Sequence, residues 1–406
     1  MAAAEVVAEG AAAVARGSYG RLIAFLAARS HDIAGAEDAL GDAFAAALVR
    51  WPLDGVPDAP EAWLLTAARR RLNDAWRHGR VAEAAEPTLR LLFDELVEDD
   101  DTASFPDERL KLMFVCAHPA IDAPARPALM LQTVLGLDAA RIAAAFLVAP
   151  AALSQRLVRA KNKIRAAGIA FEVPAADEWP ERLADVLEAI YAAYGTGWDD
   201  VAGADPQKSG LALEALDLAS TLARLLPEAA EAWGLLALLA FCQSRASARR
   251  GVDGAYVPLD HQDTSRWDAD LLRIAEAALQ RAAALGRLGP YQLEAAIQSA
   301  HTQRCLGRVV PGEAIVALYD ALVGVQPTLG AQVSRASAIG AVHGAEAGLA
   351  ALRAIDDKAL RAYQPYWAVL AHLEAAAGRP TQAQAASERA IGLASDPAVR
   401  AFLARR

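Results

Sequence analysis

Polar and positively charged side chains gather between Pro150 and Arg165, where the chain carries five cations and no carboxylate. Cations neutralise phosphates, while hydroxyl, amide and guanidinium groups can form hydrogen bonds with base edges. These residue types indicate DNA binding by Ser154, Gln155, Arg156, Arg159, Lys161 and Lys163. The alternative interpretation is a core helix whose basic face is only solvated.

A helix-turn-helix is the element expected to position these side chains. Asp138 is placed to cap a short first helix, and Pro150 opens the second, where its missing N–H costs nothing. The residues between the helices, Leu147-Val148-Ala149, are expected to form the turn. A buried stripe at helical spacing is predicted for Leu153, Leu157, Ala160 and Ile164. This spacing favours the DNA-binding interpretation.

An acidic cluster is predicted on a helix from His31 to Trp51, which is expected to end at Trp51-Pro52. Leu48 is expected on the apolar face of this helix. The acids that lie towards the other side are Glu37, Asp38 and Asp42. The loop 52–59 that follows is rich in Pro, Asp and Gly.

A second basic cluster is predicted on a helix that begins at Pro60. Its Trp63 and Trp76 are expected to pack inward. Five arginines are expected to point outward: Arg69, Arg70, Arg71, Arg77 and Arg80.

Composition predicts an all-α, cytoplasmic protein. Hydrophobic residues make up 55% of the 406 residues, much of it Ala, and no sustained alternation of apolar and polar residues is present. No apolar run is long enough for a membrane span, and the acidic N-terminus does not resemble a secretory signal. Three widely spaced cysteines are expected to be reduced. The net charge of −10 argues against non-specific coating of nucleic acid.

Four segments are predicted: a helical domain at 1–85, an acidic linker at 86–106, a helix-turn-helix domain at 107–170 and an extension at 171–406. Asp94 to Glu108 holds eight carboxylates and no cation. Helices of the extension are expected to open at Pro227, Pro290, Pro327 and Pro365, the last two gaps being 37 and 38 residues. This near-period predicts a tetratricopeptide-like stack, with a non-repeating helical bundle as the alternative.

Three stretches carry a resemblance to a known family: AEDALGDAFAAAL (36–48), PEAWLLTAARRRLNDAWR (60–77) and the segment 107–165. The chain resembles bacterial sigma factors of the sigma-70 family. More narrowly, it resembles the extracytoplasmic-function group that has a long helical C-terminal extension. Each motif alone is a weak signal, whereas the ordered set is strong.

The resemblance implies binding to core RNA polymerase, through the β′ coiled coil and the β flap, and to promoter DNA. It implies that Glu37, Asp38 and Asp42 dock on the polymerase. The arginines 69–71, 77 and 80 would contact the −10 element, and loop 52–59 would hold a flipped base. At the −35 element, Arg156 and Arg159 would contact bases, Ser154 and Gln155 could reach base edges, and Lys161 and Lys163 would contact phosphates or serve only solubility. The acidic linker would mimic RNA phosphates, and the extension would regulate in cis with a protein or ligand as its partner.

Several positions depart from the family pattern. Arg70 stands where many members have Asn near the flipped base. In the turn, Leu147 replaces a usual Gly and Ala149 replaces an expected Ser or Thr cap. Arg141 replaces a frequent Glu, so we expect one local ion pair to be missing.

Two other classes of protein compete with this interpretation. An enzyme is not expected, because the chain lacks a nucleophile elbow, a Gly-rich phosphate loop and paired-Cys metal spacing. The pairs Cys116/His118 and His301/Cys305 are better explained as buried thiols beside capping or surface histidines, so no metal or cofactor is predicted. The second class is a one-component helix-turn-helix regulator with a helical-repeat sensor, which would have no use for a polymerase-docking helix.

Overall fold

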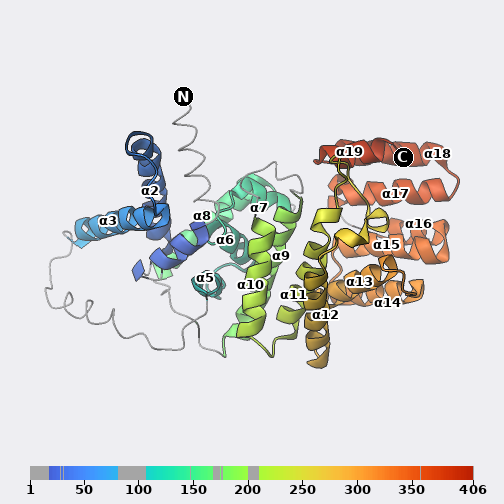
Figure 1. Cartoon of the computed structure of the whole chain (residues 1–406), viewed down its shortest axis with the longest axis horizontal. Coiled ribbons are helices and arrows are strands. Elements are labelled where there is room, and N and C mark those ends of the chain that lie inside the picture. Colours follow the sequence, from blue (N-terminus) through green and yellow to red (C-terminus); the bar gives the residue numbers. More distant parts are fainter. Residues whose placement is uncertain are drawn as a thin grey trace. The chain divides into compact units, whose positions relative to one another are not determined.

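The computed structural model describes residues 18–27, 29–30, 32–80, 107–146, 148–167, 174, 177–199, 210–356 and 358–405. Figure 1 shows that the described secondary structure is helical, apart from an isolated bridge between Arg250 and Tyr256. The prediction of an all-α fold is confirmed. The chain divides into two compact units, 1–196 with 205–211, and 197–204 with 212–406. The predicted acidic linker lies outside the described residues.

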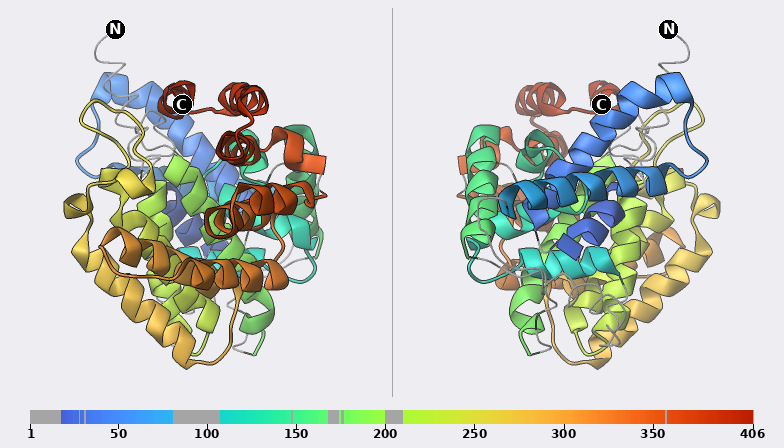
Figure 2. Two further views of the ribbon diagram at one scale, coloured as in Figure 1. Left: turned by 90° about the vertical axis from the view of Figure 1, so that its right-hand side faces the viewer. Right: turned by 90° about the vertical axis from the view of Figure 1, so that its left-hand side faces the viewer.

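The N-terminal half of the first unit contains a helical segment, residues 18–27 and 29–30, followed by α2 (Ile33–Asp54) and α3 (Pro60–Arg80). Figure 2 (right) shows these helices in blue. The carboxylate of Asp32 caps α2 by accepting the Gly35 N–H at 3.0 Å. The rings of Trp51 and Trp63 meet edge to face, with centroids 5.6 Å apart, and Trp51 is buried. This aromatic contact joins α2 to α3.

Two details of α2 differ from the sequence prediction. The helix does not end at Trp51-Pro52 but continues to Asp54, with Pro52 inside its last turn. Proline removes one helical hydrogen bond, which costs little here because Leu48, four residues earlier, is exposed and its carbonyl can be hydrated. For the same reason Leu48 does not belong to the buried face to which the sequence pattern assigned it.

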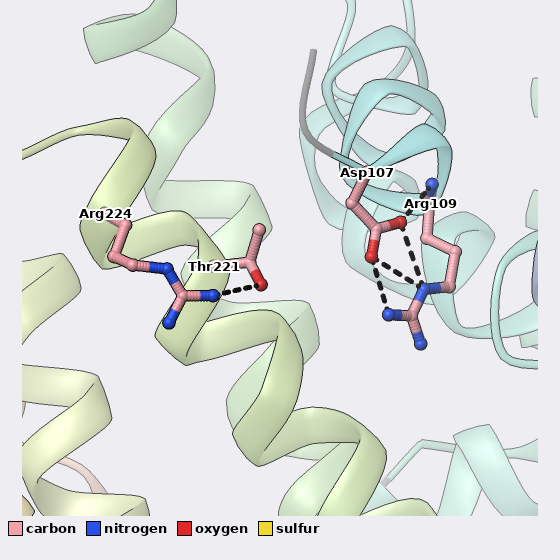
Figure 3. A network of polar contacts seen from close by, with 4 residues as sticks. All are labelled: Asp107, Arg109, Thr221 and Arg224. Carbon is pink, nitrogen blue, oxygen red and sulfur yellow. Dashed lines mark hydrogen bonds and ion pairs between the residues drawn. The ribbon is translucent and has the colours of Figure 1, made fainter.

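The remainder of the first unit consists of α5 (Glu108–Cys116), η1 (Ala123–Ala125), α6 (Arg126–Thr133), α7 (Ala139–Ala145), α8 (Pro150–Ala167) and α9 (Trp179–Asp199). Asp107 caps α5 by accepting the Arg109 N–H at 2.8 Å. The same carboxylate holds the Arg109 guanidinium, with Nη2 and Oδ2 2.6 Å apart (Figure 3). Phe114 and Leu129 are among the fully buried residues that join α5 to α6.

Helix α9 belongs to this first unit, which extends past residue 170, where the sequence analysis placed a boundary. The Arg182 guanidinium is buried and donates to the Phe114 carbonyl at 3.1 Å. Asp185 forms an ion pair with Arg126 at 3.0 Å, and the Trp179 ring lies 6.1 Å from that of Phe114. Polar and aromatic contacts thus fasten the beginning of the extension to the helix-turn-helix half.

The second unit contains the remaining helices. The longer ones are α10 (Leu211–Leu225), α11 (Ala230–Ser244), α12 (Ala269–Ala284), α13 (Pro290–Cys305), α14 (Gly312–Val325), α15 (Leu329–His343), α16 (Ala345–Arg353), α17 (Gln364–Ala376), α18 (Pro380–Leu393) and α19 (Pro397–Ala404). Shorter turns are η2 (Ala246–Ala248), η3 (Leu259–His261), η4 (Thr264–Arg266) and η5 (Lys358–Ala362). From α13 onward each helix packs on the next along the chain (Figure 1). Near the end of α10, Arg224 donates to the Thr221 hydroxyl at 3.1 Å (Figure 3).

The four prolines predicted to open helices of the extension divide into two pairs. Pro290 is the first residue of α13, and Pro365 is the second residue of α17. Pro227 and Pro327 instead precede their helices, so for these two the predicted starts are wrong. Helix α15 begins after Pro327 because the next residue, Thr328, is its cap: the Thr328 hydroxyl accepts the Ala331 N–H at 3.2 Å.

Candidate nucleic-acid interface

Helices α7 and α8 have the geometry of a helix-turn-helix. Asp138 Oδ1 caps α7 by accepting the N–H groups of Ala140 and Arg141, both at 3.0 Å. Pro150 is the first residue of α8, and the direction of the chain changes by 111° between the two helices. This angle lies within the range typical of the motif. Leu147, predicted in the turn, lies outside the described residues.

The predicted buried stripe of α8 is confirmed, since Leu153, Leu157, Ala160 and Ile164 are all buried. The opposite face presents Ser154, Gln155, Arg159 and Lys163 to solvent, with Arg156 half-buried. The Ser154 hydroxyl donates to the Pro150 carbonyl at 3.0 Å, which leaves its oxygen able to accept a hydrogen bond. The face therefore combines hydrogen-bonding groups near the helix start with cations farther along.

Arg141, which stands where the family pattern has Glu, forms an ion pair of its own. Its guanidinium pairs with Asp138, the capping residue three positions earlier. The pKa of Asp138 is lowered: burial alone would raise it, but the hydrogen bonds and charge of Arg141, together with the Ala140 N–H, outweigh burial. Asp138 therefore stays ionised and fixes the start of α7 by both its cap and its ion pair.

Lys161 does not lie on the solvent-facing side with the other predicted −35 residues. Its ammonium group pairs with the carboxylate of Glu37, a predicted polymerase-docking residue on α2, at 2.6 Å. Burial raises the pKa of Glu37 and the charge of Asp38 adds to this, while the hydrogen bond and charge of Lys161 oppose them. The structure thus brings together one residue from each of two surfaces predicted to bind different partners.

Two acids of α2 lie at one end of an exposed face, and this face is longer than the sequence analysis predicted. Asp38 and Asp42 are exposed. Val49 follows Asp38 by eleven residues, which is about three helical turns, and Leu53 follows Asp42 by the same number. The two apolar side chains are 68% and 82% exposed. Leu48, 51% exposed, has the same relation to Glu37. We call the residues Asp38, Asp42, Leu48, Val49 and Leu53 the α2 face. The eleven-residue spacing in the sequence is the signal that could have found its apolar half.

The arginines of α3 are exposed where their side chains are described. Arg69, Arg70 and Arg71 lie at the surface, and Arg71 pairs with Asp42 of the α2 face at 2.8 Å. The side chains of Arg77, Arg80 and Trp76 lie outside the described residues. Before α3 the chain is open: Gly55 has a φ of +87°, and Val56 is exposed. The exposed arginines Arg69, Arg70 and Arg71 follow this loop on α3.

Other candidate sites from the sequence do not assemble. The described residues contain no group of three or more His, Cys, Asp and Glu side chains placed to hold a metal ion. Cys116 is buried, and His118 Nδ1 accepts the Ala120 N–H at 3.1 Å, which stabilises a turn. Among the described residues no single helix is both long and apolar enough to cross a membrane.

Comparisons with known protein families match two parts of the chain. Residues 15–81 match Sigma-70 region 2, which supports a sigma-factor-like role in transcription initiation and, in general, binding to core RNA polymerase and promoter DNA. That family consists of non-enzymatic transcription factors. Residues 182–283 match a family of unknown function (DUF6596).

A relative covers nearly the whole chain. The uncharacterized protein R00370 of Rhizobium meliloti (strain 1021) is 37% identical over 374 residues, which cover 91% of this chain and 88% of that protein. The chain therefore belongs to the same family as R00370. No solved structure matches it.

Proposed function

We propose that the chain is a sigma factor of the extracytoplasmic-function type, which acts in the cytoplasm and directs core RNA polymerase to specific promoters. The observation that carries this proposal is that one compact unit holds both a sigma-70 region 2 domain and a helix-turn-helix with a basic exposed face. A simple repressor needs only the second of these. Initiation at a two-part promoter needs both.

The α2 face is the proposed contact with the polymerase, where Asp38 and Asp42, with neighbouring Glu37, meet a basic partner helix of the β′ subunit. Carboxylates at one end would set the orientation of docking and speed the encounter. Exposed Val49 and Leu53 at the other end would supply the apolar burial on which most binding energy depends. An acidic and apolar face of this kind matches a partner helix with cations at one end and apolar residues at the other.

Promoter contact is proposed for α3 and α8. Arg69, Arg70 and Arg71, with Arg77 and Arg80, would bind phosphates of the melting −10 duplex next to the open loop before α3. On α8, Ser154, Gln155, Arg156 and Arg159 would reach base edges of the −35 element, and Lys163 would bind phosphate. Lys161 would join them once it leaves Glu37. A contact between the helix-turn-helix half and the β flap completes the proposed arrangement.

The second unit is proposed to regulate these surfaces in cis. Successive packing of α13 to α19 supports a tetratricopeptide-like stack, an architecture that presents an extended surface to peptides or helices. Its partner would be a protein or a small ligand. The acidic linker at 86–106 is proposed to occupy the RNA path of the polymerase.

Run-off transcription tests the main proposal. Purified core polymerase is assayed with and without the protein on the DNA upstream of its own gene. We expect a discrete transcript that disappears with Asp38→Lys and with Val49→Asp. Glu181→Lys is the matched control, because it makes the same charge change at an exposed position on α9. Tight duplex binding without any transcript would instead identify a one-component regulator.

A further inference from the structure

Helices α12 and α13 of the second unit leave a groove between them. Helix α12 packs mainly on α11 and only lightly on α13. The space between α12 and α13 is open to solvent and measures about 330 Å³. We call it the α12–α13 groove, and its lining includes Leu272, Glu276 and Ala277 on one side and Thr302, Gln303 and Leu306 on the other.

Two buried oxygen atoms of this lining are unpaired. Thr302 is only 1% exposed, and Gln303 Oε1 is also buried. Within the described part of the chain, neither the Thr302 hydroxyl nor this amide oxygen has a hydrogen-bond partner. A buried polar group without a partner lowers stability, so most such groups in proteins are paired. Two unpaired groups at neighbouring positions of one groove indicate that a partner comes from outside the chain.

The Gln303 amide is held in one orientation by Glu276. Gln303 Nε2 donates to Glu276 Oε1 at 3.0 Å, and the Ser299 hydroxyl donates to the same oxygen at 2.8 Å. If the amide were turned over, its oxygen would face the carboxylate, so the contact assigns Oε1 of Gln303 as the free acceptor. Both bonds end at Oε1 of Glu276, and Oε2 can accept another. The groove therefore offers a carboxylate oxygen, an amide oxygen and a hydroxyl group.

These acceptors and the apolar lining select the chemical group that fits. An ammonium group carries a positive charge and three N–H donors, which match three acceptors that include a carboxylate. Leu272, Ala277 and Leu306 provide apolar surface for the methylene stem of such a group. Arg273 also lines the groove, but its guanidinium pairs with Asp270 of the same helix. The groove is thus suited to a cation on an alkyl stem.

We propose that the α12–α13 groove binds a lysine side chain on a peptide segment of a protein partner. The inference rests on the proposed role of the second unit in binding a partner. Sites for small molecules enclose most of the surface of their ligand, whereas this groove is open on one side. A side chain presented by a partner needs no enclosure, because contacts outside the groove add to its affinity. A free alkylamine is the other source of the same chemical group.

The unpaired hydroxyl provides a test without any ligand. Thr302→Val keeps the shape of the side chain and removes a buried polar group that has no partner, so the full-length protein should unfold at a higher urea concentration. Thr221→Val on α10 is the matched control, because the Thr221 hydroxyl accepts a bond from Arg224 and its loss should not raise the midpoint. If Thr302→Val does not raise the midpoint either, the hydroxyl has a structural role and the proposal is overturned.

Saturation-transfer NMR tests the ligand directly. The probe is the peptide Ala-Ala-Lys-Ala-Ala, acetylated and amidated so that lysine carries its only charge, with full-length protein. We expect transfer to the lysine methylene protons, and Glu276→Gln should weaken binding at least about tenfold, because it removes the charge and keeps the shape. Glu388→Gln makes the same change at an exposed position of α18 and should bind like the wild type. Equal binding by the wild type and Glu276→Gln, or none by the wild type at about 1 mM peptide, would overturn the proposal.

Two further probes identify the bound group and its source. Norleucine in place of lysine keeps the stem and lacks the ammonium group, so this peptide should not bind, and equal binding would contradict recognition of a cation. Butylamine at the concentration of the lysine peptide should not displace it. Displacement would assign the groove to a free amine and overturn the protein partner.

The outcome for the groove is independent of the outcome for transcription. None of these measurements contains RNA polymerase or DNA. A failed peptide titration leaves the sigma-factor proposal standing, and a failed run-off assay leaves the groove standing as a lysine site.

Discussion

At the scale of single residues, the exposed cations of α8 divide into two kinds. Arg159 can make bidentate contacts with a guanine, whereas Lys163 is a flexible point charge suited to phosphate. We predict that Arg159→Ala costs roughly 1–3 kcal/mol of promoter binding and relaxes the preference at one base pair. Lys163→Ala should weaken binding to every sequence alike and reduce the salt dependence by about one phosphate contact.

The measurement for this pair is fluorescence anisotropy of the holoenzyme on the cognate −35 duplex and on its single-base variants, at several salt concentrations. If Arg159→Ala and Lys163→Ala lower the affinity for all duplexes by the same factor, Arg159 does not read a base. That result would assign the whole α8 face to phosphate contact.

Cys116 illustrates how burial decides the chemistry of a residue. Burial raises the pKa of its thiol to about 12, although the Thr133 hydroxyl, 3.6 Å from the sulfur, opposes the shift. The reactive form is the thiolate, so a raised pKa keeps the thiol protonated and unreactive near neutral pH. We predict that iodoacetamide modifies partly exposed Cys305 in the native protein and modifies Cys116 only in denaturant, as followed by mass spectrometry. Native alkylation of Cys116 would contradict this burial.

At the scale of elements, the cap of α7 positions the recognition helix. Asp138→Ala removes the acceptor of two backbone N–H groups and should lower the free energy of unfolding by about 1 kcal/mol. Asp138→Asn retains a cap but loses the charge and the pairing with Arg141, so it separates the two contributions.

Because the pKa of Asp138 is lowered, the stability difference between the wild type and Asp138→Asn should depend on pH. A carboxylate with a lowered folded-state pKa stabilises the protein above its unfolded pKa, and that stability is lost as the pH falls through the folded value. The advantage of the wild type over Asp138→Asn should therefore shrink in acid. Urea unfolding at neutral and acidic pH measures it, and a pH-independent difference would exclude the ionic contribution.

Local signals in the sequence predicted the local parts of this site. Asp138, Pro150 and the stripe from Leu153 to Ile164 occur where caps, helix starts and buried faces require them, and α8 follows them. The end of α2 was mispredicted because an exposed last turn tolerates Pro52. Glu37 and Lys161 are 124 positions apart, and no local pattern could pair them. That contact depends on tertiary packing, as does the apolar half of the α2 face.

At the scale of the whole molecule, the location of α9 decides how the extension can be studied. Arg182 and Asp185 come after the predicted boundary at residue 171, yet both bind residues of the helix-turn-helix half. A chain cut after Gly168 loses these contacts and also exposes the Phe114 ring on which Trp179 packs. A cut after Asp199 keeps them. Only the second cut removes the repeat stack while keeping the contacts of Trp179, Arg182 and Asp185 with the helix-turn-helix half.

We therefore predict different outcomes for the two truncated chains. The chain ending at Gly168 should unfold at lower urea concentration than the chain ending at Asp199, because a buried guanidinium bond and an ion pair are missing. Arg182→Met in the longer chain should reproduce part of this loss, about 2 kcal/mol, because bonds to a charged group are the strong ones. Arg224→Met on α10 of the full-length protein should change stability little, because its guanidinium bonds to Ser220 and Thr221 of the same helix. Equal urea midpoints for the two truncated chains would show that α9 adds no stability to the first unit.

If α9 does stabilise the first unit, a stable chain ending at Asp199 can be compared with the full-length protein in run-off transcription. Any difference in transcript then belongs to the repeat stack and not to damage in the helix-turn-helix.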